Sequence, residues 1–400
     1  MYSRKGEKAM EQPMNYDVVI VGAGIGGLYT AINLPEEKNI LMICKENMEI
    51  CDSMLAQGGI SVLRDEEDYD AYFEDTMRAG HYENRKESVE IMIRGSRAVI
   101  DHLVELGVPF DKNPDGSLKY TREGAHSTPR ICFHKDITGK AITDTLQAHV
   151  RSMPNVTIME YTVMKDILVK DGVCQGVSAM AADGSMLRIS AKDTVLATGG
   201  IGGRYEHTTN YPSLTGDALD IANKYGIRLE NMNYVQFHPT SLYRETPGRS
   251  FLITESARGE GAILLNNRGE RFTDELQPRD VVSKAILKEM EKENSRHVWL
   301  SFEKIPERKI LEHFPNIYKK CLEEGYDITK EPIPVVPAQH YFMGGIYVDK
   351  DSKTTMDHLY AVGETSCNGV HGRNRLASNS LLESFVFAKR AAMNIGAGKE

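Results

Sequence analysis

The stretch YDVVIVGAGIGG, residues 16–27, decides the fold because an apolar, β-branched run leads directly into a glycine-rich turn. A continuous apolar run of this kind predicts a strand that is buried on both faces of a parallel sheet. A helix is expected from Leu28 to about Leu34, and a second apolar run, NILMIC at residues 39–44, predicts another strand. Together these elements form a βαβ unit of about 30 residues, the length that a dinucleotide-binding fingerprint requires.

The glycines of this turn predict a pyrophosphate site. Gly22 permits the tight turn, Gly24 the close approach of a phosphate, and Gly27 the packing of helix on strand, with the phosphates at the helix N-terminus. The fingerprint also expects an acidic residue about 20 residues further on, to hold a ribose hydroxyl. Lys45 stands there, followed by Glu46. Either Glu46 takes that role, or Lys45 meets a phosphate or ribose oxygen.

Composition limits the classes of protein. The chain has 400 residues, 41% of them hydrophobic, and at about 150 residues per domain it is long enough for two or three domains. Its 48 basic and 57 acidic residues give a net charge of -9 without long charged blocks, which argues against a nucleic-acid partner or a polybasic membrane anchor. No stretch reaches the roughly 18 apolar residues of a membrane span. We therefore expect a cytoplasmic protein, with residues 1–14 as a disordered leader.

No metal site is expected. The six cysteines show no CxxC spacing and no cluster with histidine, so neither a zinc site nor an iron-sulfur cluster is indicated. They are Cys44, Cys51, Cys132, Cys174, Cys321 and Cys367. Reduced, partly buried thiols are the simpler interpretation.

The order of the elements predicts an α/β fold with two domains. The apolar run DTVLATGG at 193–200 ends in glycines, and Asp-Gly turns at 171–172 and 183–184 separate the β-rich runs before it. We expect a Rossmann-like FAD-binding domain with an inserted β-meander, an arrangement typical of two-dinucleotide-fold flavoproteins rather than of NAD dehydrogenases. Residues 236–286 show little buried-strand pattern and are rich in His, Arg and Thr. They predict a separate α+β capping domain.

The predicted boundaries follow these changes in pattern. The FAD-binding domain takes residues 15–231, the capping domain 232–341, and the second part of the FAD-binding domain 342–400. Helices are expected at 280–293 and within 302–325 of the cap, and strands at 344–348 and 359–362 after it. The chain is thus expected to return to its first domain.

Four basic groups recur in or beside the predicted cap. They are His238, Arg279, His340 and Arg375. Arginine suits bidentate carboxylate binding and histidine adds a donor, so their convergence in an acidic protein would indicate a dianionic substrate. The alternative is structural: satisfied core histidines, and arginines paired with Asp280 or Glu383.

Eight ordered motifs carry a family resemblance over residues 16–392. They are GAGIGG (22–27), AQGG (56–59), REGAHS (122–127), QFHPT (236–240), TESARGEG (254–261), GERF (269–272), PRDVV (278–282) and NRLASNSLLE (374–383). The sequence resembles the succinate dehydrogenase/fumarate reductase flavoprotein superfamily and, within it, the L-aspartate oxidase family. Family members often continue into a C-terminal helical domain, whereas this sequence ends at Glu400, after a helix expected at 381–394. It therefore resembles a short form.

The resemblance implies oxidation of L-aspartate to iminoaspartate by hydride transfer to FAD, the first step of de novo NAD biosynthesis, with oxygen or fumarate reoxidising the cofactor. Membrane-bound relatives link the flavin to a histidine before the AQGG segment, but residues 51–57 read CDSMLAQ, so a noncovalent FAD is expected. Quinolinate synthase is a possible partner that would receive the product.

The same resemblance implies roles for individual residues. Arg279 matches the proton donor and acceptor, and Glu123 matches a carboxylate that faces the substrate ammonium and would disfavour an unsubstituted dicarboxylate. His238, Thr254, His340 and Arg375 match substrate-carboxylate contacts. Implied cofactor contacts are Gly22, Ala23, Gly24, Ile25, Gly26, Gly27, Lys45, Asp52, Ser53, Ala56, Gln57, Gly58, Gly59, Val163, Met164, Gly199, Asp217, Glu364, Ser380 and Leu381.

Two other functions stay open at this point. One is a soluble fumarate reductase or succinate-oxidising flavoprotein, which would be indifferent to an amino group. The other is a flavin-binding protein without catalysis, which would show flavin absorbance that aspartate does not bleach.

Overall fold

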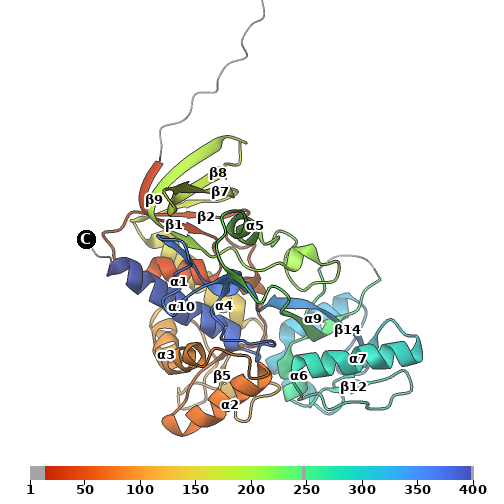
Figure 1. Cartoon of the computed structure of the whole chain (residues 1–400). Helices are drawn as coiled ribbons and strands as arrows, with labels where there is room; N and C mark the ends of the chain where they lie inside the picture. Colours follow the sequence, from red (N-terminus) through yellow and green to blue (C-terminus); the bar gives the residue numbers. More distant parts are fainter. Residues whose placement is uncertain (1–13, 246–248, 398–400) are drawn as a thin grey trace, which may run out of the picture.

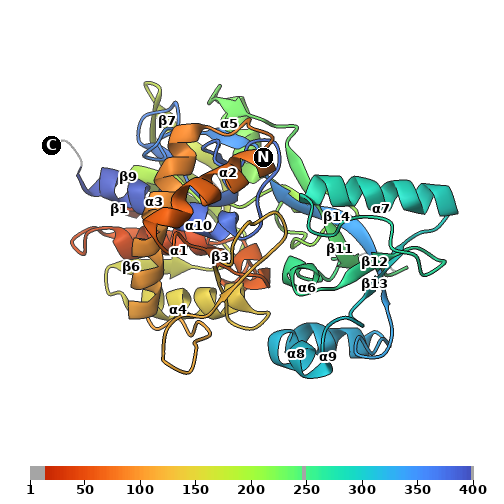
Figure 2. The same cartoon turned by 90° about the horizontal axis from the view of Figure 1, so that it is seen from below.

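The computed structural model describes residues 14–245 and 249–397 and places them in a large body and a smaller lobe (Figure 1, Figure 2). Strand β1 (Met14–Val21) begins at the residue that was expected to end a disordered leader, so that boundary was wrong by one residue. The rest of the expected leader lies outside the described residues. None of the described helices is long and apolar enough to cross a membrane.

A seven-stranded mixed sheet forms the centre of the body. Its order is β6-β2-β1-β9-β8-β7, and β16 pairs with β9. The strands that pair in parallel are β1, β2 (Ile40–Ile43), β6 (Val156–Met159), β9 (Met186–Leu196) and β16 (Leu359–Ala361). Strand β8 (Val173–Met180) pairs antiparallel with β9 on one side and with β7 (Val163–Lys170) on the other. The expected strands and the β-meander are confirmed, and both Asp-Gly pairs lie in the turns that join β7, β8 and β9.

Alternating residues of β1 pack against two separate cores. Val18 and Ile20 belong to the core under helices α1 and α10, whereas Val19 and Val21 belong to the core on the other side of the sheet. Helix α1 (Ile25–Asn33) packs on α10 (Asn379–Gly396), where the rings of Tyr29 and Phe385 meet edge to face at 4.8 Å. The last helix of the chain therefore lies against the first, far apart in sequence (Figure 1).

The remaining elements of the body are shorter or peripheral. The helices are α2 (Tyr69–Ala79), α3 (Lys86–Glu105), α4 (Thr138–Ser152) and α5 (Asp217–Lys224), with 3-10 turns η1 (Asp52–Leu55), η2 (Glu66–Asp68), η3 (Gly202–Arg204) and η4 (Gly363–Thr365). One small sheet has the strand order β3 (Ile60–Ser61), β5 (Ile131–Cys132) and β4 (Tyr120–Thr121). A second has the order β10 (Leu229–Glu230), β15 (Gly345–Tyr347) and β17 (Ser366–Cys367).

The smaller lobe is an antiparallel sheet with helices. Its strands are β11 (Val235–Leu242), β14 (Ile333–Phe342), β13 (Val298–Ser301) and β12 (Ile263–Leu265), in that order. Its helices are α6 (Glu255–Gly259), α7 (Arg279–Glu293), α8 (Glu307–His313) and α9 (Pro315–Glu323). Val282 and Ile286 of α7 join Leu264, Leu300 and Val335 in the lobe's own core.

Strand β11 corrects the expectation of little buried strand in residues 236–286. It pairs with β14, and its residues from His238 to Leu242 are all buried. The usual apolar signal is missing because four of the strand's buried side chains are polar: Gln236, His238, Thr240 and Ser241. Each is satisfied locally or faces the cavity described next, so the segment is a strand whose buried positions serve a site.

Candidate active site

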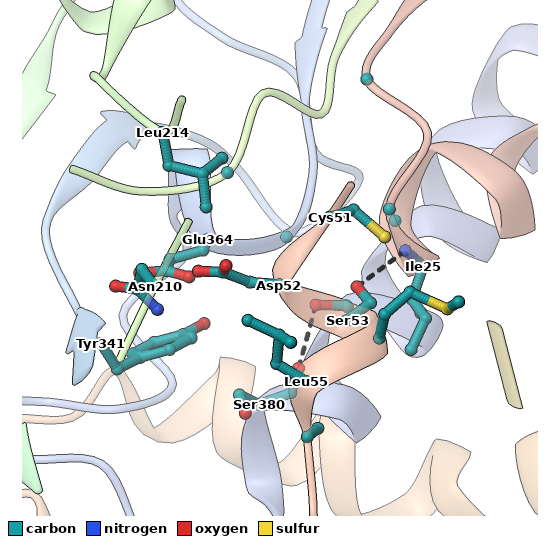
Figure 3. A pocket seen from close by; sticks show the side chains of 18 of the residues that line it. Ile25, Cys51, Asp52, Ser53, Leu55, Asn210, Leu214, Tyr341, Glu364 and Ser380 are labelled. Carbon is teal, nitrogen blue, oxygen red and sulfur yellow. Dashed lines mark hydrogen bonds between the residues drawn. The ribbon is translucent and has the colours of Figure 1, made fainter. Parts of the chain in front are cut away.

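A single large cavity of about 370 Å³ lies where the smaller lobe meets the body. It runs from the turn after β1, past η1 and the start of α10, to β11 and α7 of the lobe. Figure 3 labels side chains around it from several of these segments, among them Ile25 of α1, Asp52 of η1 and Ser380 of α10. Every catalytic or cofactor residue implied by the sequence lines it, apart from Gly27.

The glycine turn forms one end of the cavity. Gly22 has a φ of +114°, and a Cβ atom there would lie 2.1 Å from the carbonyl oxygen of Ala197, so only glycine fits. A Cβ at Gly27 would lie 2.1 Å from the carbonyl oxygen of Gly22. Gly27 thus serves packing, as the fingerprint predicts, and does not line the cavity itself. The amide of Ile25, at the helix start, donates to Ser53 Oγ at 3.1 Å.

Helix α1 begins at Ile25, three residues before the expected start at Leu28. The turn's last two glycines therefore belong to the first helical turn. The first-turn amides of α1 have no partner within the helix, and the one at Gly26, which lines the cavity, is a group that a helix N-terminus offers to a phosphate.

Lys45 and Glu46, the two candidates for the ribose end, both line the cavity. The Lys45 ammonium donates to Ser213 O at 3.0 Å, Thr215 Oγ1 at 3.0 Å and Asp217 Oδ2 at 2.9 Å. Lys45, which lies just after the end of β2, is therefore bonded to the loop before α5 and to the first residue of α5. Val163, Met164 and Gly199 also line the cavity.

Two carboxyl groups stand near the middle of the cavity, side by side in Figure 3. Asp52 accepts from the amide of Tyr211 at 2.9 Å through Oδ1, and Glu364 accepts from the amide of Phe342 at 2.9 Å. Loss of water raises the pKa of Asp52 to about 7, and loss of water together with the charge of Asp52 raises that of Glu364 to about 8. Asp52 Oδ2 and Gln57 Oε1 are buried and have no protein partner among the described residues.

The start of α10 faces the cavity from the body. Ser378 caps it in the left-handed conformation, with a φ of 61°, and Ser380 and Leu381 in the first turn line the cavity. First-turn amides have no partner within the helix and carry partial positive charge. They suit an acceptor-rich ring edge on which negative charge develops.

The two histidines of the opposite end come from neighbouring strands. His238 of β11 and His340 of β14 have ring centroids 5.1 Å apart. The amide of Thr240 donates to His238 Nδ1 at 3.2 Å, so the neutral ring carries its proton on Nε2, which is buried without a protein partner. Burial, and then the charge of Arg279, holds the pKa of both histidines well below the usual value. Both are therefore neutral donors or acceptors.

The two arginines approach the same space from different elements. Arg279, the first residue of α7, donates through Nε to Glu255 Oε2 at 2.5 Å and through Nη1 to Gln236 Oε1 at 2.9 Å. Arg375 donates through Nη1 to Ser380 Oγ at 2.5 Å and lies 4.4 Å from the centroid of the Tyr341 ring. Its Nε is buried and has no protein partner.

The two ion pairs considered for these arginines, to Asp280 and to Glu383, do not form among the described residues, although Arg279 does have a buried carboxylate partner. Arg279 pairs with Glu255, and its neighbour Asp280 contacts His81 instead, at 3.1 Å. Burial, and then the charge of Arg279, lowers the pKa of Arg375 to about 10, which leaves it a cation at neutral pH. Glu383 accepts a hydrogen bond from Asn368 and not from Arg375.

Glu255 is the residue of this end that sequence analysis did not assign. It is fully buried between Arg279 and Arg258, with Arg258 Nη2 at 3.4 Å from Oε2. Burial acts to raise its pKa, but the two guanidinium groups outweigh burial and the pKa is lowered. The only signal was its place in the motif at 254–261.

Glu123 lies within the cavity as expected, and it is almost fully buried. Its Oε1 accepts from Ser256 Oγ at 2.9 Å and its Oε2 from Ser378 Oγ at 2.5 Å. Burial, and then the nearby charge of Glu255, raises its pKa. A carboxylate thus faces the same space as two arginines and two histidines.

Comparison with known proteins gives a consistent result. The FAD binding domain family matches residues 17–381. The chain is 50% identical to the L-aspartate oxidases of Clostridium perfringens and Clostridium acetobutylicum over 380 residues, covering 95% of this chain and 86% and 87% of theirs. Among solved structures it resembles E. coli quinol fumarate reductase, with a TM-score of 0.91 at 34% identity over 97% of this chain and 72% of that one.

The cavity fits FAD on its own residues. The backbone of the glycine turn lines the cavity at the start of α1, where a pyrophosphate can bind, and unpaired acceptors at Asp52 and Gln57 suit a hydroxyl-rich chain. The amides at the start of α10 suit the flavin edge. Both the matches and this chemistry show an enzyme that uses FAD. The chain therefore belongs to the L-aspartate oxidase family of FAD-dependent oxidoreductases.

Proposed function

We propose that this protein oxidises L-aspartate to iminoaspartate, with bound FAD accepting the hydride from the substrate Cα. The observation that carries the proposal is the meeting of Arg279, Arg375, His238 and His340 with the Glu123 carboxylate at one end of the FAD cavity. Two carboxylates and one ammonium on a four-carbon chain are the charges that this set complements. The named relatives of the chain support the same substrate.

Arg375, His238, His340 and Thr254 are proposed to hold the two substrate carboxylates. Arg375 Nε and His238 Nε2 are buried donors without protein partners, so each can donate to a carboxylate oxygen without giving up another bond. Neutral histidines add hydrogen bonds without adding charge. The substrate is then oriented by several directed donors, which fixes Cα against the cofactor.

Arg279 is proposed to exchange the proton that accompanies hydride transfer. A guanidinium rarely gives up a proton, so such a residue needs an acceptor in direct contact. Glu255 Oε2 lies 2.5 Å from Arg279 Nε and 3.4 Å from Arg258 Nη2. Arg258 is buried and donates to Glu275 O at 2.6 Å. Glu255 is therefore the proposed acceptor for the Arg279 proton, and the charge of Arg258 stabilises its ionised form.

Glu123 is proposed to bind the substrate ammonium. It is a buried carboxylate that lines the cavity, so it attracts an ammonium and disfavours a dicarboxylate that lacks one. This is the physical reason to prefer aspartate over succinate.

The wider role follows from the family and is part of the proposal. The product would enter de novo NAD biosynthesis, oxygen or fumarate would reoxidise the cofactor, and quinolinate synthase would be the partner that takes the imine. The FAD is proposed to be noncovalent, because residues 51–57 contain no histidine. Residues 232–341 are proposed as a capping domain that closes over the substrate. The FAD-binding domain against which it closes is proposed to consist of residues 15–231 and 342–400.

A soluble fumarate reductase or succinate-oxidising enzyme is the second candidate. The resemblance to E. coli quinol fumarate reductase favours it, and the same arginines and histidines would bind any four-carbon dicarboxylate. Glu123 is the residue that distinguishes the two proposals.

Anaerobic mixing of the FAD-loaded protein with L-aspartate, D-aspartate or succinate tests the proposal through the flavin absorbance. We expect bleaching with L-aspartate alone. Bleaching by succinate with none by L-aspartate would assign the protein to the second candidate. Unchanged absorbance with all three would argue against both.

A further inference from the structure

The Glu123 carboxylate is positioned by two hydroxyl groups that come from different parts of the molecule. Ser256 belongs to α6 of the smaller lobe and donates to Oε1 at 2.9 Å. Ser378 precedes α10 of the body and donates to Oε2 at 2.5 Å. Each carboxylate oxygen therefore has one donor, and the plane of the carboxylate is fixed from both sides.

Close backbone contacts leave Glu123 little freedom. A Cβ at Gly58 would lie 2.3 Å from Glu123 Oε1, so the carboxylate passes directly over the Gly58 backbone. A Cβ at Gly259 would lie 2.5 Å from the carbonyl oxygen of Arg122, so the end of α6 packs on the segment that carries Glu123. The hydrogen bond from Ser256 therefore links α6 of the smaller lobe to the segment that carries Glu123.

Ser378 reaches Glu123 from an unusual backbone conformation. Its φ of 61° is in the left-handed region, which a residue with a Cβ adopts at an energetic cost. Its carbonyl oxygen accepts from Ser61 N at 3.1 Å and Ser61 Oγ at 3.0 Å. The Tyr72 hydroxyl donates to Asn379 Oδ1 at 2.8 Å, and Ser61 Oγ lies 2.7 Å from the same oxygen. A buried network holds the Ser378 hydroxyl toward the carboxylate.

The charges around Glu123 make these donors necessary. Glu255, Arg279 and Arg258 are the ionisable groups that face it from α6 and α7. Burial and Glu255 raise the Glu123 pKa, whereas hydrogen bonds from Ser378 and Ser256 lower it by stabilising the charged form. Without the hydroxyls, the carboxyl group would keep its proton to higher pH and would lose its attraction for an ammonium.

We infer that Ser256 and Ser378 are positioning residues that orient the Glu123 carboxylate and so set the preference for an amino-substituted dicarboxylate over an unsubstituted one. This rests on the proposed function, in which Glu123 binds the ammonium. Because one donor comes from each part of the molecule, the ammonium site is complete only when the lobe is seated. Selectivity and seating of the lobe are therefore coupled.

The test uses Ser256→Ala and Ser378→Gly in the FAD-loaded full chain, with Ser283→Ala as the matched control. Glycine at 378 removes the hydroxyl without adding strain at a φ of 61°. Ser283 is a buried serine of α7 whose hydroxyl bonds to the Phe237 carbonyl and which does not line the cavity. Flavin difference spectra give the Kd of L-aspartate and of succinate, and kcat/KM for L-aspartate is measured from pH 5 to 9.

Each variant should weaken L-aspartate binding by about tenfold, the effect of one hydrogen bond to a charged group, while succinate binding changes less than about twofold. The acidic limb of the kcat/KM profile should move to higher pH, and the control should match the wild type. An equal loss for both ligands, or an unmoved pH limb, would overturn the inference. A wild type that binds succinate as well as L-aspartate would instead overturn the proposed function and the inference with it.

Discussion

The two ends of the cavity are built in different ways. The cofactor end depends on backbone that is local in sequence: a six-residue turn where glycine is required because neighbouring carbonyl oxygens leave no space for a Cβ. The substrate end depends on buried ionisable side chains from β11, β14, α7 and the segment before α10. The cofactor end should therefore be sensitive to added volume, and the substrate end to lost charge.

Arg279→Leu should give the largest effect and tests the substrate end. We expect FAD to be retained while turnover with L-aspartate falls by about 10² to 10⁴-fold, the usual contribution of catalytic proton transfer. Flavin content by absorbance and rapid-mixing reduction rates would measure the two quantities separately.

The control for that prediction is Arg268→Leu in the same lobe. Arg268 is more than half exposed and pairs with Glu270 at 2.9 Å, outside the cavity. The Arg268→Leu variant should oxidise L-aspartate at the wild-type rate. Normal turnover in Arg279→Leu as well would remove this arginine from the proposed chemistry.

The variant Glu383→Gln tests whether a buried carboxyl group outside the cavity changes how the free energy of unfolding depends on pH. Burial raises the pKa of Glu383 from its usual 4.5 to about 7. The folded state therefore holds a proton that the unfolded state has released, and the stability linked to Glu383 is present below pH 4.5 and is lost as pH rises through about 7. Relative to wild type, the glutamine variant should gain up to about 3 kcal/mol between pH 4.5 and pH 8.

Denaturant unfolding at several pH values would measure this difference. The exposed Glu90→Gln serves as the control and should show no such trend. If the difference in the free energy of unfolding between wild type and Glu383→Gln did not change with pH, Glu383 would be ionised in the folded protein.

Gly27→Ala tests the cofactor end with a single methyl group. The new Cβ would lie 2.1 Å from the Gly22 carbonyl oxygen, so α1 must move away from the turn. Overpacking of this kind costs about 1–3 kcal/mol, and FAD affinity should fall by about tenfold or more. In the control, Gly95→Ala in α3, the Cβ meets only Val386 methyl groups at 3.1 Å. FAD titration of both variants would compare a backbone collision with a side-chain contact.

The same contrast explains what sequence could predict. The glycine turn and its flanking strands were predictable because their requirements are local. The roles of Glu255, Ser256 and Ser378 were not, because each depends on a partner more than 20 residues away, such as the contacts of Ser256 and Ser378 with Glu123. Strand β11 was missed because its buried face is polar, which removes the apolar pattern that predicts a strand.

Lys45→Met should have the smallest effect and decides between two assignments at the ribose end. Lys45 and Asp217 are each about a third exposed, and pairs of that kind contribute at most about 1 kcal/mol. Because the Lys45 ammonium already has three protein acceptors, its loss should loosen the loop before α5 and weaken FAD binding less than about fivefold.

Glu46→Gln, the matched variant, should leave FAD affinity unchanged. A loss beyond about thirtyfold for Lys45→Met would mean that the ammonium binds the cofactor directly. A larger loss for Glu46→Gln than for Lys45→Met would instead assign the ribose hydroxyl to Glu46, and the cofactor end would then depend on a charged side chain as the substrate end does.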